Sequence, residues 1–428
     1  MPGLIVAAPA SGSGKTLVTL GLLRAFRDRG VAVRGAKSGP DYIDPRFHEA
    51  ACGAPSVNLD AWAMSPARLR ALAATDDLLI VEGAMGLFDG AAGGGGSVAD
   101  LAKVLGLPVV LVVDAARIGQ SVAALVAGFA GFDPEVRIAG VILNRTGSER
   151  HVRMLRQALD SLDVPVLGAI PRDAALAHPS RHLGLVQAEE RDDLDAFLAH
   201  AGRTVAERID LHALEGLARP PTGGAVPPRR RPPGQRIAVA RDAAFGFSYP
   251  HLLADWREAG AEIAFFSPLA DETVPGADFV YLPGGYPELH AQRLSVAQTF
   301  MQSLRKASQT ADVVGECGGY MVLGDGLVDA AGTRHAMAGL LRLETSFAAP
   351  RLHLGYRRAR VVAGPLAGPW AAHEFHYART LRAEGDPLLT DVSDAEGADL
   401  LDAGLRLGRV SGSFLHLIEP MDLPPAGA

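Results

Sequence analysis

The segment GECGG, residues 315–319, places a cysteine between glycines at the end of an apolar stretch that predicts a buried strand. This order matches the nucleophile elbow, G-x-nucleophile-x-G, in which a tight turn between a strand and a helix projects the reactive side chain. A thiol needs a histidine or a helix N-terminus to become a thiolate at neutral pH. The helix expected to begin near Gly319 supplies one of these. Cys317 is therefore predicted to be a catalytic nucleophile rather than a small core residue.

Thirteen histidines are available to activate this thiol. His416 follows an apolar stretch in VSGSFLHLIEP and is the first candidate, while His373 and His376 in AHEFHYAR are its rivals. The HEFH sequence lacks the H-E-x-x-H spacing and shows no third ligand, so no zinc site is predicted there. The segment YLPGGYPE forms a second glycine turn after a predicted strand. Backbone N–H groups of Gly318 and Gly285 are accordingly predicted to stabilise an oxyanion.

A second motif, APASGSGKT, occupies residues 8–16 between a predicted strand and a predicted helix. It supplies the second half of the Walker A pattern G-x-x-x-x-G-K-[ST], but Pro9 stands where the first glycine belongs. Glycines let backbone N–H groups turn inward around phosphate oxygens, a lysine reaches the terminal phosphates, and a hydroxyl binds Mg²⁺. The segment is therefore predicted to bind a nucleotide through Gly12, Ser13, Gly14, Lys15 and Thr16.

Charged residues that could complete a nucleotide and metal site follow other predicted strands. Glu82 comes at the end of the apolar stretch LLIV, where a Walker B acid would lie. The segment KSGPDYIDPRFH, residues 37–48, adds Lys37, Asp41 and Asp44. Mg²⁺ prefers oxygen ligands, and open α/β sheets bind ligands at the carboxyl ends of their strands. These residues are therefore candidates for binding nucleotide, metal or substrate.

The bulk composition limits the class of protein. The chain has 428 residues, with 48 acidic and 41 basic side chains, which is too long for one ordinary domain and gives no basic surface for nucleic acid. Two cysteines cannot form a disulfide framework. The N-terminus runs into the glycine loop without a basic leading segment, and no stretch has membrane character. We expect a cytoplasmic enzyme without nucleic-acid or membrane partners.

The order of apolar and helical segments predicts two α/β domains. Strands are expected in GLIVAAP, DLLIVEGA, LPVVLVVDAA and RIAGVILNR, and again in RIAVARD, AEIAFFSPL, ADFVYLPGG and DVVGECGG. Unbroken apolar strands that alternate with helices indicate a doubly wound parallel sheet. A segment rich in proline and arginine separates the halves and reads as a linker. The predicted boundaries are residues 1–218, a linker at 219–235, and residues 236–428.

Taken together, these motifs resemble the cobyrinic acid or hydrogenobyrinic acid a,c-diamide synthase family. LPGGYPELH, GECGGYMVLG, HEFHYAR and SGSFLHL are similar to class I glutamine amidotransferase domains of the cobalamin-biosynthesis type. KSGPDYIDPRFH, VEGAMGLFDG, GVILNR and PSRHLGLV are similar to the synthetase half of the family, which has a P-loop fold like that of dethiobiotin synthetase. The resemblance extends from about residue 3 to residue 420.

This resemblance implies two coupled reactions. Cys317, assisted by His416, would attack glutamine to form a thioester and release ammonia, while ATP and Mg²⁺ would activate a corrin carboxylate as an acyl phosphate that ammonia converts to an amide. Lys37 would neutralise the developing acyl phosphate. The residues carried over by motif are Asn144 for the nucleotide, Thr16, Asp41 and Glu82 for Mg²⁺, and Asp41, Tyr42 and Asp44 for the corrin. Partners would be small molecules, and a homodimer is left open.

One position departs from the pattern of many glutamine amidotransferases. They carry a glutamate two residues after the catalytic histidine, whereas this chain has Ile418 there and Glu419 one residue later. Either Cys317 and His416 act as a dyad, or another group, such as a backbone carbonyl, orients the imidazole. The sequence leaves the third member of the site unassigned.

Three other functions compete with the leading one. Cobyric acid synthesis and amidation of nickel sirohydrochlorin keep the chemistry and change the tetrapyrrole. A partition-type P-loop ATPase that binds protein or DNA is the alternative of another class, and it would need no elbow cysteine. The GPDYIDP segment argues against cobyric acid synthesis and favours the metal-free ring over the cobalt-containing one.

Overall fold

The computed structural model describes residues 2–176, 180–181, 184–185, 187–224 and 231–421, and it divides into two compact units at Pro227/Pro228. Residues 225–230 of the predicted linker lie outside the described part, as do parts of the PSRHLGLV motif. The preceding linker residues contact the first unit, because Arg219 and Gly3 exchange backbone hydrogen bonds and Thr222 N–H donates to the carbonyl of Leu105.

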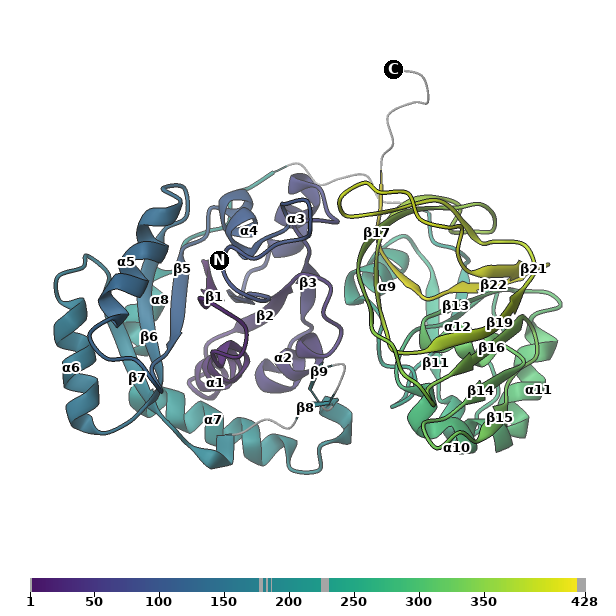
Figure 1. The fold of residues 1–428 in the computed structure, drawn as a ribbon, viewed down its shortest axis with the longest axis horizontal. Helices are drawn as coiled ribbons and strands as arrows, with labels where there is room; N and C mark the ends of the chain where they lie inside the picture. Colours follow the sequence, from purple (N-terminus) through teal and green to yellow (C-terminus); the bar gives the residue numbers. More distant parts are fainter. Residues whose placement is uncertain (1, 177–179, 182–183, 186, 225–230, 422–428) are drawn as a thin grey trace, which may run out of the picture. The chain divides into compact units, whose positions relative to one another are not determined.

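The first unit contains a seven-stranded, wholly parallel sheet with the order β3-β2-β4-β1-β5-β6-β7 (Figure 1). Its strands are short and mostly buried on both faces, which explains their unbroken apolar sequences. In chain order they are β1 (Gly3–Ala7), β2 (Val33–Ser38), β3 (Val57–Leu59), β4 (Leu78–Glu82), β5 (Val109–Asp114), β6 (Ile138–Thr146) and β7 (Val166–Pro171).

Helices connect these strands and cover the sheet. The helices are α1 (Lys15–Asp28), α2 (Asp44–Cys52), α3 (Pro66–Ala73), α4 (Val98–Leu105), α5 (Val122–Phe132), α6 (Glu149–Leu159), α7 (Leu194–Arg208) and α8 (Leu211–Leu217). The chain moves in one direction across the sheet from β1 to β3 and in the other from β3 to β7. Right-handed crossovers then place α1 and α2 on one face and α3 to α6 on the other. The connection after β1 leads toward β2, whereas the connection after the neighbouring strand β5 leads the other way, toward β6. A crevice therefore opens at the carboxyl ends of β1 and β5.

The second unit is built around a six-stranded sheet of order β11-β10-β12-β13-β22-β21, parallel except for the edge strand β21. Its strands are β10 (Arg236–Ala240), β11 (Glu262–Phe266), β12 (Phe279–Leu282), β13 (Asp312–Glu316), β21 (Leu405–Leu407) and β22 (Val410–Ser413). The helices are α9 (Pro250–Glu258), α10 (Ala291–Val296), α11 (Gln298–Ala307) and α12 (Gly318–Leu323).

Two four-stranded sheets complete the second unit, with the orders β15-β14-β16-β19 and β20-β17-β18-β23. Their strands are β14 (Gly326–Val328), β15 (Arg334–Ala336), β16 (Arg342–Ser346), β17 (His353–Val361), β18 (Gly368–His376), β19 (Arg379–Glu384), β20 (Leu389–Asp394) and β23 (Leu415–Pro420). In the second of these sheets every pairing is antiparallel. The apolar segments of the sequence do not predict these sheets.

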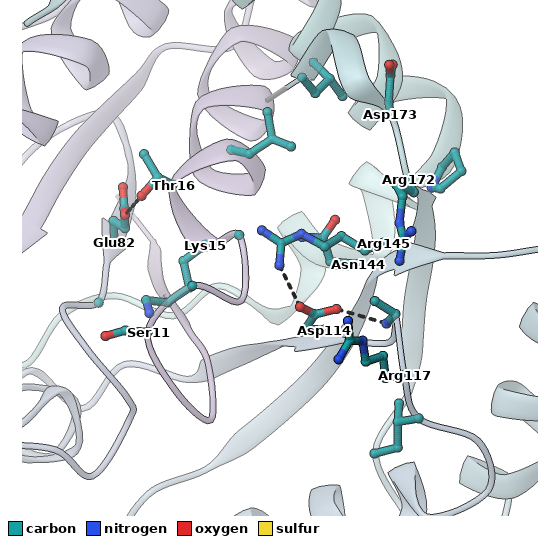
Figure 2. Close-up of a pocket in the computed structure, with 18 of the residues that line it drawn as sticks. Ser11, Lys15, Thr16, Glu82, Asp114, Arg117, Asn144, Arg145, Arg172 and Asp173 are labelled. Atoms are coloured by element: carbon teal, nitrogen blue, oxygen red, sulfur yellow. Dashed lines mark hydrogen bonds and ion pairs between the residues drawn. The ribbon is translucent and has the colours of Figure 1, made fainter. Parts of the chain in front are cut away.

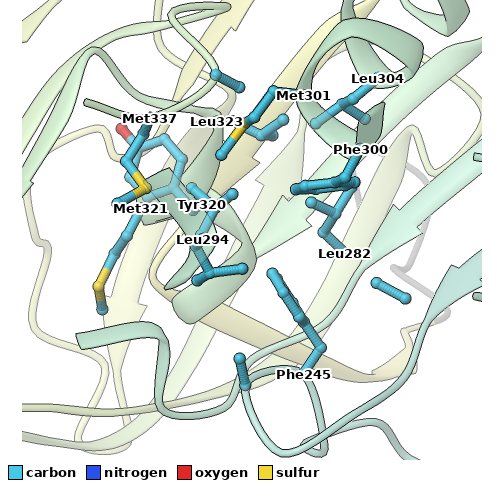
Figure 3. Close-up of a cluster of buried hydrophobic side chains, with 14 of the residues drawn as sticks. Phe245, Leu282, Leu294, Phe300, Met301, Leu304, Tyr320, Met321, Leu323 and Met337 are labelled. Carbon is cyan, nitrogen blue, oxygen red and sulfur yellow. The ribbon is translucent and has the colours of Figure 1, made fainter. Parts of the chain in front are cut away.

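The core of the second unit joins three helices to the central sheet (Figure 3). Leu294 of α10, Phe300 of α11 and Met321 of α12 belong to one buried cluster with Leu282 of β12. The α12 helix lies especially close to β12, since a β-carbon on Gly319 would stand 1.9 Å from the carbonyl oxygen of Leu282. This close packing fixes the turn that precedes α12, which contains Cys317.

Candidate active sites

The loop between β1 and α1 has the backbone shape that a phosphate loop needs. Gly12 and Gly14 adopt φ values of 79° and 88°, in the left-handed region that favours glycine. Asn144, at the end of β6, supports this loop because its Nδ2 donates to the carbonyl of Ser13 at 2.9 Å. A β-carbon on Gly14 would stand 2.2 Å from the same Nδ2 atom. Asn144 therefore positions the loop as well as lying at the predicted nucleotide site.

A cavity of about 1150 Å³ opens beside this loop, at the carboxyl ends of the parallel strands (Figure 2). The residues that line it come from the carboxyl-terminal parts of β2, β4, β5, β6 and β7, from loops that follow strands, and from the start of α1, as the position of a ligand site in a doubly wound sheet requires. Among them are Gly12, Gly14, Lys15, Thr16, Lys37, Glu82, Met85, Asp114, Arg117, Asn144, Arg145, Arg172 and Asp173. Glu82, the predicted Walker B acid, thus lines the same cavity as six other predicted residues: Gly12, Gly14, Lys15, Thr16, Lys37 and Asn144.

Lys15 contacts the backbone of the cavity wall. Its Nζ donates to the carbonyl of Met85 at 2.5 Å. Met85 has an unusual φ of 52° and is 55% exposed. Burial, together with the positive charge of Lys37, lowers the pKa of Lys15 to about 8. A bound phosphate would supply the negative charge that this ammonium group lacks.

Glu82 is the centre of a buried polar network. Its Oε1 accepts from Thr16 Oγ1 at 2.6 Å and from Lys37 Nζ at 2.9 Å, and its Oε2 lies 2.7 Å from His48 Nε2. Glu82 and His48 are fully buried. Burial by itself would raise the pKa of Glu82, but the charge of Lys37 and the hydrogen bond from His48 outweigh burial and lower it.

Lys37 forms a second ion pair, with Asp44 Oδ2 at 2.5 Å. Burial opposes the charge of Lys37, but Asp44 and Glu82 outweigh this effect and raise its pKa above the usual range. The lysine thus remains a cation in the floor of the cavity. The position of Lys37 agrees with contact to a phosphate group. Its part in catalysis stays a prediction.

The three predicted corrin-binding residues lie at the start of α2. Asp41 Oδ1 accepts from the backbone N–H groups of Ile43 and Asp44, at 2.8 and 2.9 Å, and so stabilises the turn just before the helix. Tyr42 and Asp44 are buried, with 7% and 6% of their surfaces exposed. Contact between these residues and a substrate stays a prediction, as does binding of Mg²⁺ by Asp41.

Charged residues that the sequence analysis missed line the opposite side of the cavity (Figure 2). Arg145 Nη1 contacts Asp114 Oδ2 at 2.6 Å, and Arg117 and Arg172 also line the cavity. Arg145 has a φ of 54°, which is rare outside glycine and occurs at functional turns. Each lies in the last residues of a parallel strand or shortly after it, so position at a strand end was the signal that could have found them.

In the second unit, Cys317 occupies the strained turn that the elbow pattern predicts. Its φ of 47° and ψ of −104° lie outside the usual regions, and it immediately precedes α12. The thiol is not projected into solvent as expected. It is 4% exposed, and its Sγ lies 4.0 Å from the carbonyl oxygen of Phe375 in β18. The added antiparallel sheet covers the elbow, and burial, with the charge of Glu288, raises the pKa of the Cys317 thiol.

The structure places His416 beside Cys317. The point that a β-carbon of Gly284 would occupy lies 3.0 Å from His416 Nε2 and 3.2 Å from Cys317 Cβ. The edge of the imidazole that carries Nε2 and the β-carbon of Cys317 therefore lie against the same glycine, whose missing side chain leaves the space open. Burial, followed by the charges of His373 and His376, lowers the pKa of His416 to about 3. The imidazole is consequently neutral at physiological pH.

The two predicted oxyanion glycines are neighbours in space. A β-carbon on Gly318 would stand 3.0 Å from the backbone nitrogen of Gly285. At Gly285, a β-carbon would meet the carbonyl oxygen of Ala244 at 2.1 Å, so only glycine fits. The N–H group of Gly318 also contacts the sulfur of Cys317 and opposes the rise in its pKa. The N–H group of Gly318 thus lies at the nucleophile, and stabilisation of an oxyanion by Gly318 and Gly285 stays a prediction.

Glu316, the residue before Cys317, was missed as a functional residue. Its Oε2 accepts from the hydroxyl of Tyr281 at 2.7 Å and lies 3.8 Å from His416 Nδ1. Burial raises the pKa of Glu316 to about 7, against the effect of its hydrogen bonds. Glu419, the acid closest in sequence to the family position, has its Oε2 3.7 Å from His251 Nε2 instead.

A second cluster lies on β17 and β18, close to the elbow. Side chains of His353, Glu374 and His376 place one ligand-type atom each within 4.8 Å of one another. His353 was not recognised from sequence as a partner of the HEFH segment. However, Arg357 Nη2 already contacts Glu374 Oε2 at 2.8 Å. A guanidinium at the same carboxylate competes with a cation, so no metal site is assigned there.

Comparison with known proteins decides between the possible relationships. Residues 4–186 match the CobQ/CobB/MinD/ParA nucleotide binding domain family, and residues 236–421 match the CobB/CobQ-like glutamine amidotransferase domain family. The hydrogenobyrinate a,c-diamide synthase of Rhizobium meliloti is 58% identical over 98% of this chain and 99% of its own length. That of Brucella anthropi is 56% identical over 98% and 99%.

The chain belongs to the hydrogenobyrinate a,c-diamide synthase family. Membership confirms the resemblance and both predicted fold classes, and it identifies the chain as an amide ligase of the glutamine amidotransferase type. A partition-type ATPase is thereby excluded. A solved glutamine amidotransferase covers 42% of this chain and 89% of its own, at 16% identity and a TM-score of 0.31, which is too low to support any conclusion.

This member of the hydrogenobyrinate a,c-diamide synthase family thus contains a nucleotide binding domain and a glutamine amidotransferase domain, which form separate compact units. Across the residues that the structure describes, every helix is too short or too polar to span a membrane.

Proposed function

We propose that this enzyme uses ATP and glutamine to amidate the a and c carboxylates of hydrogenobyrinic acid, in the cytoplasm. The observation that carries the proposal is the presence, in one chain, of a Cys317–His416 pair and a glycine loop that presents Lys15 and Thr16 to a cavity. Relatives that align over nearly their whole length bear the corresponding name and support the choice of ring.

In the second unit, the neutral imidazole of His416 takes the proton of Cys317 as the sulfur attacks the side-chain carbonyl carbon of glutamine. Negative charge develops on the carbonyl oxygen, where the N–H groups of Gly318 and Gly285 stabilise it. The C–N bond then breaks, and His416 returns the proton to the leaving nitrogen. Ammonia departs, and water hydrolyses the thioester to glutamate.

In the first unit, the glycine loop binds the phosphates of ATP, and Lys15 and Lys37 balance the charge of the transferring phosphoryl group. Thr16 Oγ1 and Glu82 Oε1 are oxygen donors 2.6 Å apart at the cavity, a donor set that suits Mg²⁺. When bound, Mg²⁺ would neutralise phosphate charge. The substrate carboxylate attacks the γ-phosphorus, ADP leaves, and ammonia displaces phosphate from the acyl phosphate to form the amide.

The other tetrapyrroles considered remain the alternatives within this chemistry. Cobyrinic acid differs by the central cobalt, and nickel sirohydrochlorin and the cobyric acid precursor differ in the ring and the carboxylates used. The names of the full-length relatives favour the metal-free ring.

The decisive experiment incubates the full chain with ATP, Mg²⁺ and glutamine, and with each ring in turn. Mass spectrometry counts the amide groups formed. Two amides on hydrogenobyrinic acid, with slower or absent reaction on the cobalt-containing and nickel-containing rings, support the proposal. Reaction on another ring alone would replace the substrate, and formation of no amide on any ring would refute the function.

The control replaces glutamine with ammonium chloride. A Cys317→Ser variant should then form both amides from ammonium but none from glutamine, since it lacks only the nucleophile that releases ammonia. This comparison assigns the thiol to ammonia release rather than to activation of the carboxylate.

A further inference from the structure

His416 Nε2 and Cys317 Cβ both lie close to the point that a β-carbon of Gly284 would occupy, so Nδ1 is the ring nitrogen that a positioning residue would contact. In many glutamine amidotransferases a glutamate two residues after the histidine fills this role, but here that position is Ile418, which is fully buried among apolar residues of β23. The carboxylate in reach of Nδ1 is Glu316, whose Oε2 lies 3.8 Å away. Glu316 directly precedes Cys317 in the sequence, whereas the usual glutamate follows the histidine.

Glu316 is held in this position from two neighbouring strands. It is the last residue of β13, and it pairs with Ser413 of β22, three residues before His416. The hydroxyl of Tyr281, on β12, donates to Oε2 at 2.7 Å, and the N–H of Leu417 contacts Oε1 at 3.3 Å. The side chain is 3% exposed. A buried carboxylate with two donors and an imidazole beside it is a fixed acceptor rather than a solvated acid.

We propose that Glu316, itself held by Tyr281, is the positioning residue that orients His416 for proton transfer to and from Cys317. The inference rests on the proposed glutamine hydrolysis. As the thiol proton moves to Nε2, the imidazole becomes a cation, and its Nδ1–H points to the carboxylate of Glu316. The carboxylate stabilises this cation until Nε2 returns the proton to the departing nitrogen and ammonia leaves. Glu316 neither gains nor loses a proton in the cycle.

The ionisation of Glu316 should be visible in the pH dependence of glutamine hydrolysis. The groups that face it are Tyr281 on β12, His416 on β23 and the adjacent Cys317, and Tyr249 acts on Tyr281 from the loop before α9. The pKa of Glu316 is about 7, whereas that of His416 is about 3. The rate should therefore fall as pH drops below about 7, because Glu316 gains a proton while His416 is already neutral.

The test measures kcat and KM for glutamine hydrolysis in the full chain, from about pH 6 to pH 9. Glu316→Gln should lower kcat about 10- to 100-fold with KM changed less than about 2-fold, the size of effect expected when general acid–base catalysis is impaired. The variant should also lose the rise in kcat near pH 7. The matched control is Glu419→Gln, which removes the acid closest to the usual family position and should leave kcat and the pH profile as in the unmodified enzyme.

A second variant separates positioning from folding. Tyr281→Phe removes one hydroxyl that stabilises the carboxylate, so the midpoint of the pH profile should move to higher pH, with only a few-fold loss of kcat at about pH 9. An unchanged midpoint in Tyr281→Phe, a retained rise near pH 7 in Glu316→Gln, or a larger loss in Glu419→Gln than in Glu316→Gln would each overturn the proposal.

Amidation from ammonium chloride distinguishes this inference from the proposed function. Each variant should amidate the ring from ammonium at the rate of the unmodified enzyme, since Glu316 serves only glutamine hydrolysis. Absence of amidation from ammonium in the unmodified enzyme would count against the proposed function alone, because glutamine hydrolysis and its pH profile would still report on Glu316.

Discussion

The pKa of Lys15 is low enough for a bound phosphate to change the charge of this lysine. Burial and the charge of Lys37 keep its pKa at about 8, so a fraction of the lysine is neutral in mildly alkaline solution. A nucleotide phosphate favours the charged form and raises this pKa. Nucleotide binding is thereby linked to proton uptake.

We expect ATP binding at about pH 8.5 to take up on the order of half a proton or more, because Lys15 must regain its charge. Calorimetry in buffers of different ionisation enthalpy measures this uptake. Lys15→Arg provides the control, since a guanidinium stays charged at this pH. Equal uptake in both proteins would show that another group is responsible.

Replacement of Glu316 by glutamine is expected to have opposite effects on activity and on stability. Its folded-state pKa of about 7 lies above the ordinary 4.5, so the folded state binds the proton more tightly than the unfolded state. The contribution of Glu316 to the free energy of unfolding is therefore most favourable below about pH 4.5, and this contribution is lost as the pH rises through about 7. Glu316→Gln should raise the free energy of unfolding by about 1–3 kcal/mol at pH 8 while it impairs hydrolysis.

Thermal melting of the full chain at about pH 5 and pH 8 tests this expectation. The increase in Tm for Glu316→Gln should be larger at the higher pH than at the lower one, because at about pH 5 Glu316 is protonated in the folded state and no charge is buried there. A decrease in Tm at pH 8 would mean that the lost hydrogen bonds outweigh the cost of burying the charge.

At the scale of elements, the turn after β12 keeps the nucleophile and the base together. Gly284 lies between them, and a β-carbon there would stand 2.3 Å from His416 Cε1. Such a distance forces the imidazole to move. Because β12 also carries Tyr281 and leads to Gly285, one strand and its turn organise the whole thiol site.

Gly284→Ala should reduce glutamine hydrolysis by about 100-fold or more, since a displacement near 1 Å in a catalytic group has this order of effect. Ammonium-dependent amidation should persist. Gly276→Ala is the matched control, because a β-carbon at that position meets nothing within 4 Å. Equal activity of the two variants would place His416 elsewhere during catalysis.

At the scale of the whole molecule, the two units divide the chemistry, so each half-reaction can be disabled separately. Lys15→Gln should abolish amidation from both glutamine and ammonium, by at least about 100-fold, because charge stabilisation at the phosphates is lost. Its glutamine hydrolysis without ATP should remain. Combined assays of ADP, glutamate and amide measure the three outputs, and loss of basal hydrolysis in Lys15→Gln would contradict this division.

The sequence was sufficient to predict much of the central sheets. The eight strands predicted from apolar stretches correspond to β1, β4, β5, β6, β10, β11, β12 and β13, because strands buried on both faces leave a local signature. The two four-stranded sheets of the second unit were missed. In β18 and β23 polar residues such as His373, Glu374 and His416 interrupt the apolar pattern.

The sequence by itself determined which residues can do chemistry, since the phosphate loop and the cysteine elbow are each contained within a few consecutive residues. Only the tertiary structure decided which groups meet. Glu316 reaches His416, a hundred positions later, because β22 pairs beside β13 and β23 follows it. Strand neighbours and register depend on the packing of the complete sheet, and that information is not present in any short segment.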